Sequence, residues 1–214
     1  MTPARRAIAF ALALLVFALG GCGEAPPPET EFWSWFGENA SRLSWARNTP
    51  GNPQAAEISE RIARVHPELR FELEGEPGAR RALVITAEGR REVAPHVERL
   101  AEAMPADVAG WDVKAFRPQL GTDLAIDYLG FVLEPDAVWF APPEIPEDGR
   151  GLTLELYLDG VGGPTNDLAR KAGELLLHAA LGERAVLERI AWTHYRALPE
   201  DPLAEGLRPL PSLV

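Results

Sequence analysis

The chain has 214 residues but only one cysteine, Cys22, and two lysines, Lys114 and Lys171. A single cysteine excludes an intramolecular disulfide, so the free energy of folding has to come from a hydrophobic core. Positive charge is scarce as well, because 21 arginine and lysine residues face 32 aspartates and glutamates. Such an acidic chain is poorly matched to nucleic-acid phosphates and to anionic lipid headgroups. We therefore expect no nucleic-acid partner.

The sequence also lacks the short motifs of common catalytic and cofactor sites. It contains no HExxH, no GxSxG, and no GxGxxG or GxxxxGK[ST] pattern. In the glycine-rich stretch 159–167, Asp167 would oppose a phosphate, so we interpret this stretch as a connection that ends in a Thr or Asn helix cap. The acid-rich segment 134–148 lacks the DxDxDG spacing of a calcium loop, and we interpret it as solvated. We predict no catalytic residue, no metal and no cofactor.

The most specific pattern lies near the start of the chain. Arg5 and Arg6 precede an uncharged apolar run over residues 7–19, which is shorter than the ~20 residues of a membrane-spanning helix. The following Leu19-Gly20-Gly21-Cys22 resembles the lipobox of bacterial lipoproteins. This resemblance implies that Cys22 becomes the N-terminus and carries the fatty chains, palmitate among them. An ordinary signal peptide cut nearby, with Cys22 incidental, is the alternative.

The lipobox resemblance also implies a location. Two or more fatty chains anchor a protein stably in a bilayer, whereas a single chain does not. Gly23 follows the cysteine, and the absence of Asp there resembles the pattern of Gram-negative lipoproteins that are sorted to the outer membrane. We therefore expect a protein that is anchored by its lipid in the cell envelope, at the outer membrane and facing the periplasm. Its expected contacts are the membrane, through the lipid, and an envelope protein.

We divide the chain into four parts, namely a signal peptide, a lipidated cysteine with a Pro-rich tether, a globular domain and a Pro-containing C-terminal tail. Their ranges are 1–21, 22–30, 31–198 and 199–214. Loss of Arg5 and Arg6 with the signal peptide leaves 19 of the 21 basic residues against 32 acidic ones, a net charge of −13. Prolines 26–28 favour extended geometry, and at about 3.1 Å per residue the tether reaches on the order of 25 Å. The domain is therefore expected close to its membrane.

Hydrophobic periodicity predicts an α+β fold. Apolar residues recur at helical spacing over 31–46, 54–66, 90–104 and 165–181. Alternation predicts a hairpin formed by residues 71–73 and 83–85, and further strands over 111–116, 124–128, 131–133, 138–140, 152–158 and 186–196. The strand-rich middle has no regular alternation of strands and helices. We therefore predict a single domain in which about four helices pack largely on one face of a mostly antiparallel sheet.

Two short aromatic motifs add a second resemblance. They are Phe32-Trp33-Ser34-Trp35-Phe36 at the start of a helix and Ala115-Phe116-Arg117-Pro118 at the end of a strand. Together with a closing helix and strand, they resemble a group of uncharacterised bacterial α+β proteins over most of residues 31–198. This resemblance implies a single domain and carries no activity or site.

Five side chains are candidates for binding or chemistry. Trp33 and Trp35 flank the apolar face of the first helix, where they either join the core or contact a ligand. Arg117, at the end of a strand, either receives a carboxylate from a ligand or partner, or pairs with an acid of the chain itself. His178 and His194 are the histidines that the fold can bring together, with a carboxylate, for zinc binding or acid–base work. Isolated histidines on the surface or in the core are the alternative.

These observations favour a binding or protein-interaction module of the envelope, with an unknown ligand and no catalytic role. One alternative is an envelope hydrolase that uses metal or His/carboxylate chemistry at His178 and His194. Another is a structural assembly lipoprotein, which requires an exposed apolar patch of several hundred Å².

Overall fold

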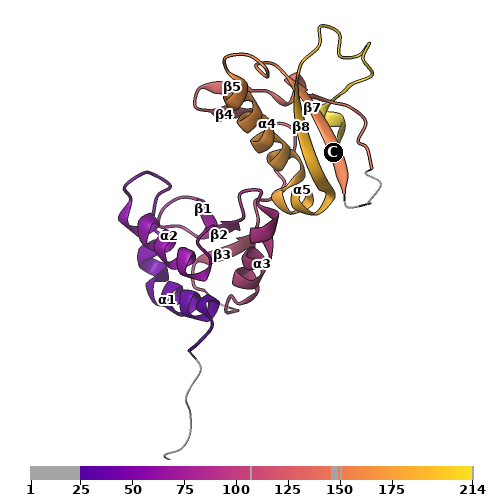
Figure 1. The fold of residues 1–214 in the computed structure, drawn as a ribbon. Coiled ribbons are helices and arrows are strands. Elements are labelled where there is room, and N and C mark those ends of the chain that lie inside the picture. The colour runs from indigo at the N-terminus through magenta and orange to yellow at the C-terminus, as the bar shows by residue number, and fades with distance from the viewer. Residues whose placement is uncertain (1–24, 107, 146–148, 150, 214) are drawn as a thin grey trace, which may run out of the picture.

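Two groups of elements joined at a waist make up the structure (Figure 1). The computed structural model describes residues 25–106, 108–145, 149 and 151–213. The helices are α1 Pro28–Leu43, α2 Pro53–Val65, α3 Ala94–Glu102, α4 Asn166–Leu181 and α5 Glu183–Arg189. The strands are β1 Arg70–Glu74, β2 Arg81–Thr86, β3 Trp111–Ala115, β4 Ile126–Tyr128, β5 Phe131–Leu133, β6 Trp139–Phe140, β7 Leu152–Leu158, β8 Ile190–Ala197 and β9 Arg208–Pro209. The predicted α+β class is confirmed.

The N-terminal lobe runs from α1 through β3 to the turn at 116–117, and it is built on a sheet of order β1-β2-β3. β1 and β2 form the predicted antiparallel hairpin, in which Phe71 lies opposite Ile85. β3 is parallel to β2, and the 3-10 turn Arg91–Val93 and α3 make the connection between them. Residues from α1, α2 and α3 share one core cluster with the sheet. All three helices therefore cover the same face.

Aromatic rings fill the centre of the N-terminal lobe. Phe36 meets Trp33 and Trp111 edge-on, with ring centroids 5.6 and 5.0 Å apart. Both indole N–H groups find carbonyl acceptors, because Trp33 donates to Leu100 over 2.6 Å and Trp111 donates to Ala40 over 3.0 Å. Buried indoles need such partners. The aromatic motif of α1 therefore holds helix and sheet together.

The C-terminal lobe runs from β4 to the end of the described chain and contains the two-stranded sheet β4-β5 and the four-stranded sheet β8-β7-β6-β9. β8 is parallel to β7, and α4 and α5 connect them. α4 contacts the β4-β5 hairpin as well as β7. The core here is aliphatic, with fully buried residues such as Leu156, Ala172 and Leu176. The chain end also belongs to it, because β9 pairs with β6 and Leu210 is buried.

The structure refines the predicted arrangement in two respects. It contains three sheets with two parallel strand pairs, where the sequence predicts one mostly antiparallel sheet. The strand predicted over 186–196 begins only at Ile190, because the preceding residues form α5. The Arg91 guanidinium caps that helix by donating to the carbonyls of Leu187 and Ile190, a contact with the other lobe that local sequence does not encode. Within the described residues, no helix is long and apolar enough to span a membrane.

Candidate ligand-binding site

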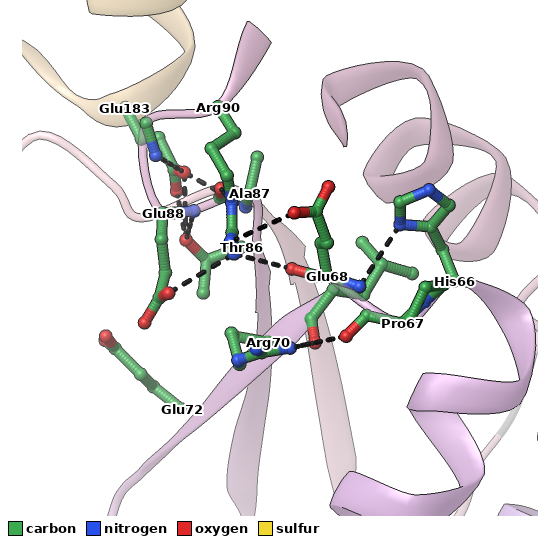
Figure 2. Close-up of polar contacts among 12 residues, drawn as sticks. His66, Pro67, Glu68, Arg70, Glu72, Thr86, Ala87, Glu88, Arg90 and Glu183 are labelled. Carbon is green, nitrogen blue, oxygen red and sulfur yellow. Dashed lines mark hydrogen bonds and ion pairs between the residues drawn. The ribbon is translucent and has the colours of Figure 1, made fainter. Parts of the chain in front are cut away.

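Three segments meet at the waist between the lobes. One is the loop 86–90 after β2, the second is the segment 116–121 after β3, and the third is the corner between α4 and α5. β2 and β3 are parallel, so their carboxyl ends lie at the same edge of the sheet. This edge faces the corner, and Figure 2 shows Glu183 reaching from its helix to Thr86 and Ala87.

Glu183 is fully buried, and its carboxylate fills a nest of donors on the N-terminal lobe. The Thr86 hydroxyl lies 2.9 and 2.7 Å from Oε1 and Oε2. Oε1 also accepts the N–H groups of Ala87 at 3.0 Å and Gly89 at 3.1 Å, and Oε2 accepts the N–H of Arg117 at 3.1 Å. Such a nest of backbone N–H groups is a typical anion site. Here the protein occupies it with its own carboxylate, which anchors the two lobes to each other.

Local backbone geometry aims Glu183 into this nest. Gly182 ends α4 with a φ of 81°, and a Cβ added there would lie 3.1 Å from the backbone nitrogen of Gln119. Phe116 also has a positive φ of 70°, which is rare for a bulky residue. The turn that it makes lets the Arg117 carbonyl accept the Glu183 N–H at 3.1 Å. Because both ends of Glu183 are held, we interpret it as a structural anchor.

His178, on α4, is the buried polar side chain at the waist that lacks hydrogen bonds. Its exposed fraction is 5%, and its Nδ1 is buried without a hydrogen-bond partner among the described residues. Burial lowers the pKa of His178, although Glu183 and Glu174 oppose this change. The imidazole is therefore neutral near neutral pH. We place its single proton on Nε2, because an orphaned buried N–H donor is rarer than an orphaned acceptor.

A cavity of about 420 Å³ opens beside this imidazole, and we call it the waist pocket. Its polar lining comes from both lobes and includes Gly89, Arg91, Glu174, His178, Thr193 and Tyr195. Gly89 keeps the imidazole accessible, because an added Cβ would lie 3.2 Å from Cε1 and 3.4 Å from Nε2 of His178. The Cε1–Nε2 edge of His178 therefore lies against Gly89, which itself lines the waist pocket.

The remaining polar groups of the waist pocket are held in place by their neighbours. Lys171 and Glu174 form an ion pair at 3.0 Å. The Tyr195 ring packs on α4, where a Cβ at Gly173 would approach it to 3.0 Å, and the Arg170 guanidinium lies 5.6 Å above the ring centroid. Burial raises the pKa of the Tyr195 hydroxyl, with a further contribution from Glu174, so this group stays protonated. The pocket thus offers neutral imidazole, phenol and hydroxyl groups beside a charge pair.

A second cavity, of about 300 Å³, lies on the other side of His178 between β1, β4 and α4. Its lining includes Glu72, Arg117, Asp127 and Leu175. Arg117 pairs here with Glu72 at 2.6 Å, so the internal ion pair is the interpretation that the structure supports. The guanidinium remains protonated, since Glu72 raises the pKa of Arg117 against the desolvation that lowers it.

The structure places the other predicted side chains away from a common site. Trp33 is 2% exposed and lies in the core, whereas Trp35 is 9% exposed and also lines a separate cavity, where the Arg61 guanidinium lies over its ring. His178 and His194 do not come together, because Thr193 and Tyr195 line the waist pocket and His194 alternates with them on the opposite face of β8. Within the described residues, no group of three or more His, Cys, Asp or Glu side chains is placed to hold a metal.

Two further predictions concern loops. In the glycine-rich connection Thr165 precedes α4 as predicted but makes no side-chain cap hydrogen bond, while the Asn166 side chain accepts the Gly162 N–H of the loop at 3.0 Å. In the acid-rich segment, Asp136 lies in a 3-10 turn and Glu144 bridges to Thr153, while 146–148 lie outside the described residues. Cys22 and the signal peptide also lie outside them.

Sequence reasoning missed Glu183, Gly89 and Tyr195. Two local signals were present in the sequence. A Thr ends the wholly apolar run 82–85, and a Glu directly follows the helix-ending Gly182. Thr86 and Glu183 are 97 positions apart, so their hydrogen bond is visible only in the folded structure. No protein-family model, curated protein or solved structure matches this chain.

Proposed function

We propose that the protein is a lipid-tethered binding protein of the bacterial envelope, and that the waist pocket is its ligand site. The tether rests on the resemblance of Leu19-Gly20-Gly21-Cys22 to a lipobox. The ligand site rests on one observation, the buried His178 without a hydrogen-bond partner on the wall of a polar cavity. A buried polar group without a partner is unfavourable by about 1–3 kcal/mol. That penalty belongs to Nδ1 and remains when a ligand binds, whereas Nε2–H is the donor that a ligand acceptor in the waist pocket would engage.

The donors of the waist pocket favour a ligand with a carboxylate or carbonyl oxygen. His178 and Tyr195 both line the cavity, and each keeps one proton to donate, because burial lowers the pKa of the His178 imidazole and raises the pKa of the Tyr195 hydroxyl. Glu174 is neutralised by Lys171 and so does not repel an anion strongly. We therefore expect small carboxylates and amides to be the first compounds that bind.

Cell fractionation tests the tether. The wild-type chain should stay in the membrane fraction and incorporate a clickable palmitate analogue, whereas the Cys22→Ser variant should do neither. Equal membrane retention of both proteins, without label, would show that Cys22 is not lipidated.

Ligand-observed NMR with a set of small carboxylates and amides tests the site, using the full chain in detergent. His178→Asn keeps a polar atom near Nδ1 and removes Nε2, and we expect it to weaken binding at least about tenfold. The matched control is His66→Asn, because the His66 ring lies against that of His96 in the N-terminal lobe, with centroids 4.0 Å apart, and does not line the waist pocket. The control should bind like the wild type. Equal binding by the His178 variant, or no binding by the wild type, would reject the site.

A second candidate function is hydrolysis, which one observation favours. The neutral imidazole of His178 shares the cavity with Tyr195 and Glu174, which is a set that can move protons. The predicted partner His194 takes no part, so His178 is the one histidine of the predicted pair that this version uses. Turnover of esters and amides in the same NMR samples, lost in His178→Asn, would favour a hydrolase over a binding protein.

A further inference from the structure

β8 is an edge strand with an open outer side. The order β8-β7-β6-β9 leaves it paired only with β7, and no other described strand or bridge pairs with it. Its exposed residues include Trp192, His194 and Arg196, and the Trp192 side chain is 67% exposed. Native proteins protect such edges, because the free N–H and C=O groups pair readily with another strand. An open edge of eight residues therefore favours a partner that pairs with it.

The open edge is continuous with the waist pocket. Ala191, Thr193 and Tyr195 of β8 line that pocket, together with His178 and Glu174 of α4. Side chains of a strand point alternately to the two faces of a sheet. A strand added beside β8 would therefore place every second side chain over the waist pocket. Its other side chains would lie beside Trp192.

Charges along this edge differ from those of the whole molecule. Arg170 lies over Tyr195, Arg91 donates to two carbonyls, and neither has a carboxylate partner among the described residues. Lys171 and Arg196 are balanced by Glu174 and Glu155. Glu92, on the rim of the pocket, opposes this positive charge in part. The edge thus carries a slight excess of positive charge, whereas the chain as a whole has a net charge of −11.

We propose that the open edge of β8 binds an extended, acidic peptide segment of another envelope protein. The segment pairs with β8 as a fifth strand of the four-stranded sheet and directs side chains into the waist pocket. A carboxylate of the peptide accepts a hydrogen bond from His178 Nε2–H, and an apolar side chain on the other face covers Trp192. This inference rests on the proposed function of the waist pocket and names its ligand class.

A peptide pool tests the charge preference. Peptides of about eight residues, a normal strand length, would carry Val and Thr alternating with positions drawn from Asp, Glu, Lys and Arg. The immobilised full chain should enrich the Asp- and Glu-rich members. Enrichment of Lys- and Arg-rich members, or no enrichment at all, would overturn the proposal.

N-methylation of the best peptide tests strand pairing without altering the protein. Alternate N–H groups of an added strand point towards β8 and away from it. Methylation of the inward set should weaken binding at least about tenfold, whereas methylation of the outward set should leave it unchanged. Equal effects of the two patterns would show that the peptide does not bind as a strand.

Two charge-reversed variants complete the test. Arg170→Glu should weaken binding of the acidic peptide about tenfold, while the control Arg64→Glu, on the exposed surface of α2, should not. If neither variant changes peptide binding, the charge argument is wrong.

Sedimentation tests the alternative occupant, which is a second copy of the chain. We expect a monomer. Self-association through β8 that excludes the peptide would overturn the proposal.

The outcomes separate this inference from the proposed function. If small carboxylates still require His178 but peptides bind without regard to the methylation pattern, the edge is not the docking site and the waist pocket stands. If His178→Asn changes the binding of neither probe, the proposed function itself fails.

Discussion

The two lobes contain the same kind of parallel connection but leave different sheet faces open. β2, α3 and β3 form it in the N-terminal lobe, and β7, α4, α5 and β8 form it in the C-terminal lobe. Ion pairs such as Glu74–Lys114 cover the open face of the first sheet. The open face of the second sheet has an ion pair as well, Glu155–Arg196, but it also carries Trp192, which is 67% exposed. A charged face is well solvated without a partner, whereas an exposed aromatic edge is not, so we place binding on the C-terminal lobe.

The buried polar groups of the waist show the same contrast. The N-terminal lobe supplies all the donors that satisfy Glu183, and this group therefore contributes to stability. His178 belongs to the C-terminal lobe and has no such partners. Glu183 and His178 lie only five positions apart, so their different surroundings, and not their place in the sequence, separate an anchor from a candidate binding group.

The largest expected effect comes from removal of the anchor. Glu183→Ala leaves the Thr86 hydroxyl and three backbone N–H groups without their acceptor. We expect the free energy of unfolding, measured in urea, to fall by about 3–5 kcal/mol. Glu188→Ala is the control, because Glu188 lies on the exposed side of the same helix, and its change should stay within about 0.5 kcal/mol. A similar loss for both variants would mean that Glu183 does not join the lobes.

A smaller effect is expected from the pH dependence of stability. Burial lowers the pKa of His178 in the folded state below the ordinary value of 6.5, so the unfolded state binds the proton more tightly. The contribution to stability is therefore fully present above about pH 6.5 and is lost as the pH falls through the folded pKa, by at most about 1.4 kcal/mol per pH unit. His178→Asn should lack this component. Urea unfolding of both proteins at about pH 7.5 and about pH 5.5 measures it, and parallel curves would contradict the assignment.

The smallest effects on stability should come from the two open surfaces. Lys114→Met breaks a half-exposed ion pair of the first sheet and should lower the free energy of unfolding by no more than about 1 kcal/mol. Trp192→Ser changes an exposed side chain, and we expect less than about 0.5 kcal/mol. Peptide binding should nevertheless be weakened only by Trp192→Ser. If Lys114→Met and Trp192→Ser bind the peptide equally well, the two sheets do not differ in peptide binding.

Local sequence patterns predicted the individual elements well. The strand predicted over 152–158 matches β7, and Gly182 ends α4 as expected. The hairpin of β1 and β2 follows from alternating apolar residues on either side of a turn. These features depend on neighbours within a few residues, because periodicity and caps act locally. The lipobox is likewise a local pattern, and its function stays a prediction.

The arrangement of those elements was decided by tertiary structure. The sequence alone determined the α+β class and most helix and strand boundaries to within a few residues, but it left Trp33 and Trp35 open between the core and a ligand. Only the folded chain brings Thr86 to Glu183, turns 183–189 into a helix, and separates His178 from His194 across β8. These outcomes depend on contacts between residues about a hundred positions apart, such as Arg91 with Ile190. Periodicity shows which face of a helix or strand is buried. It does not show which other element packs against that face, because this depends on how the lobes meet.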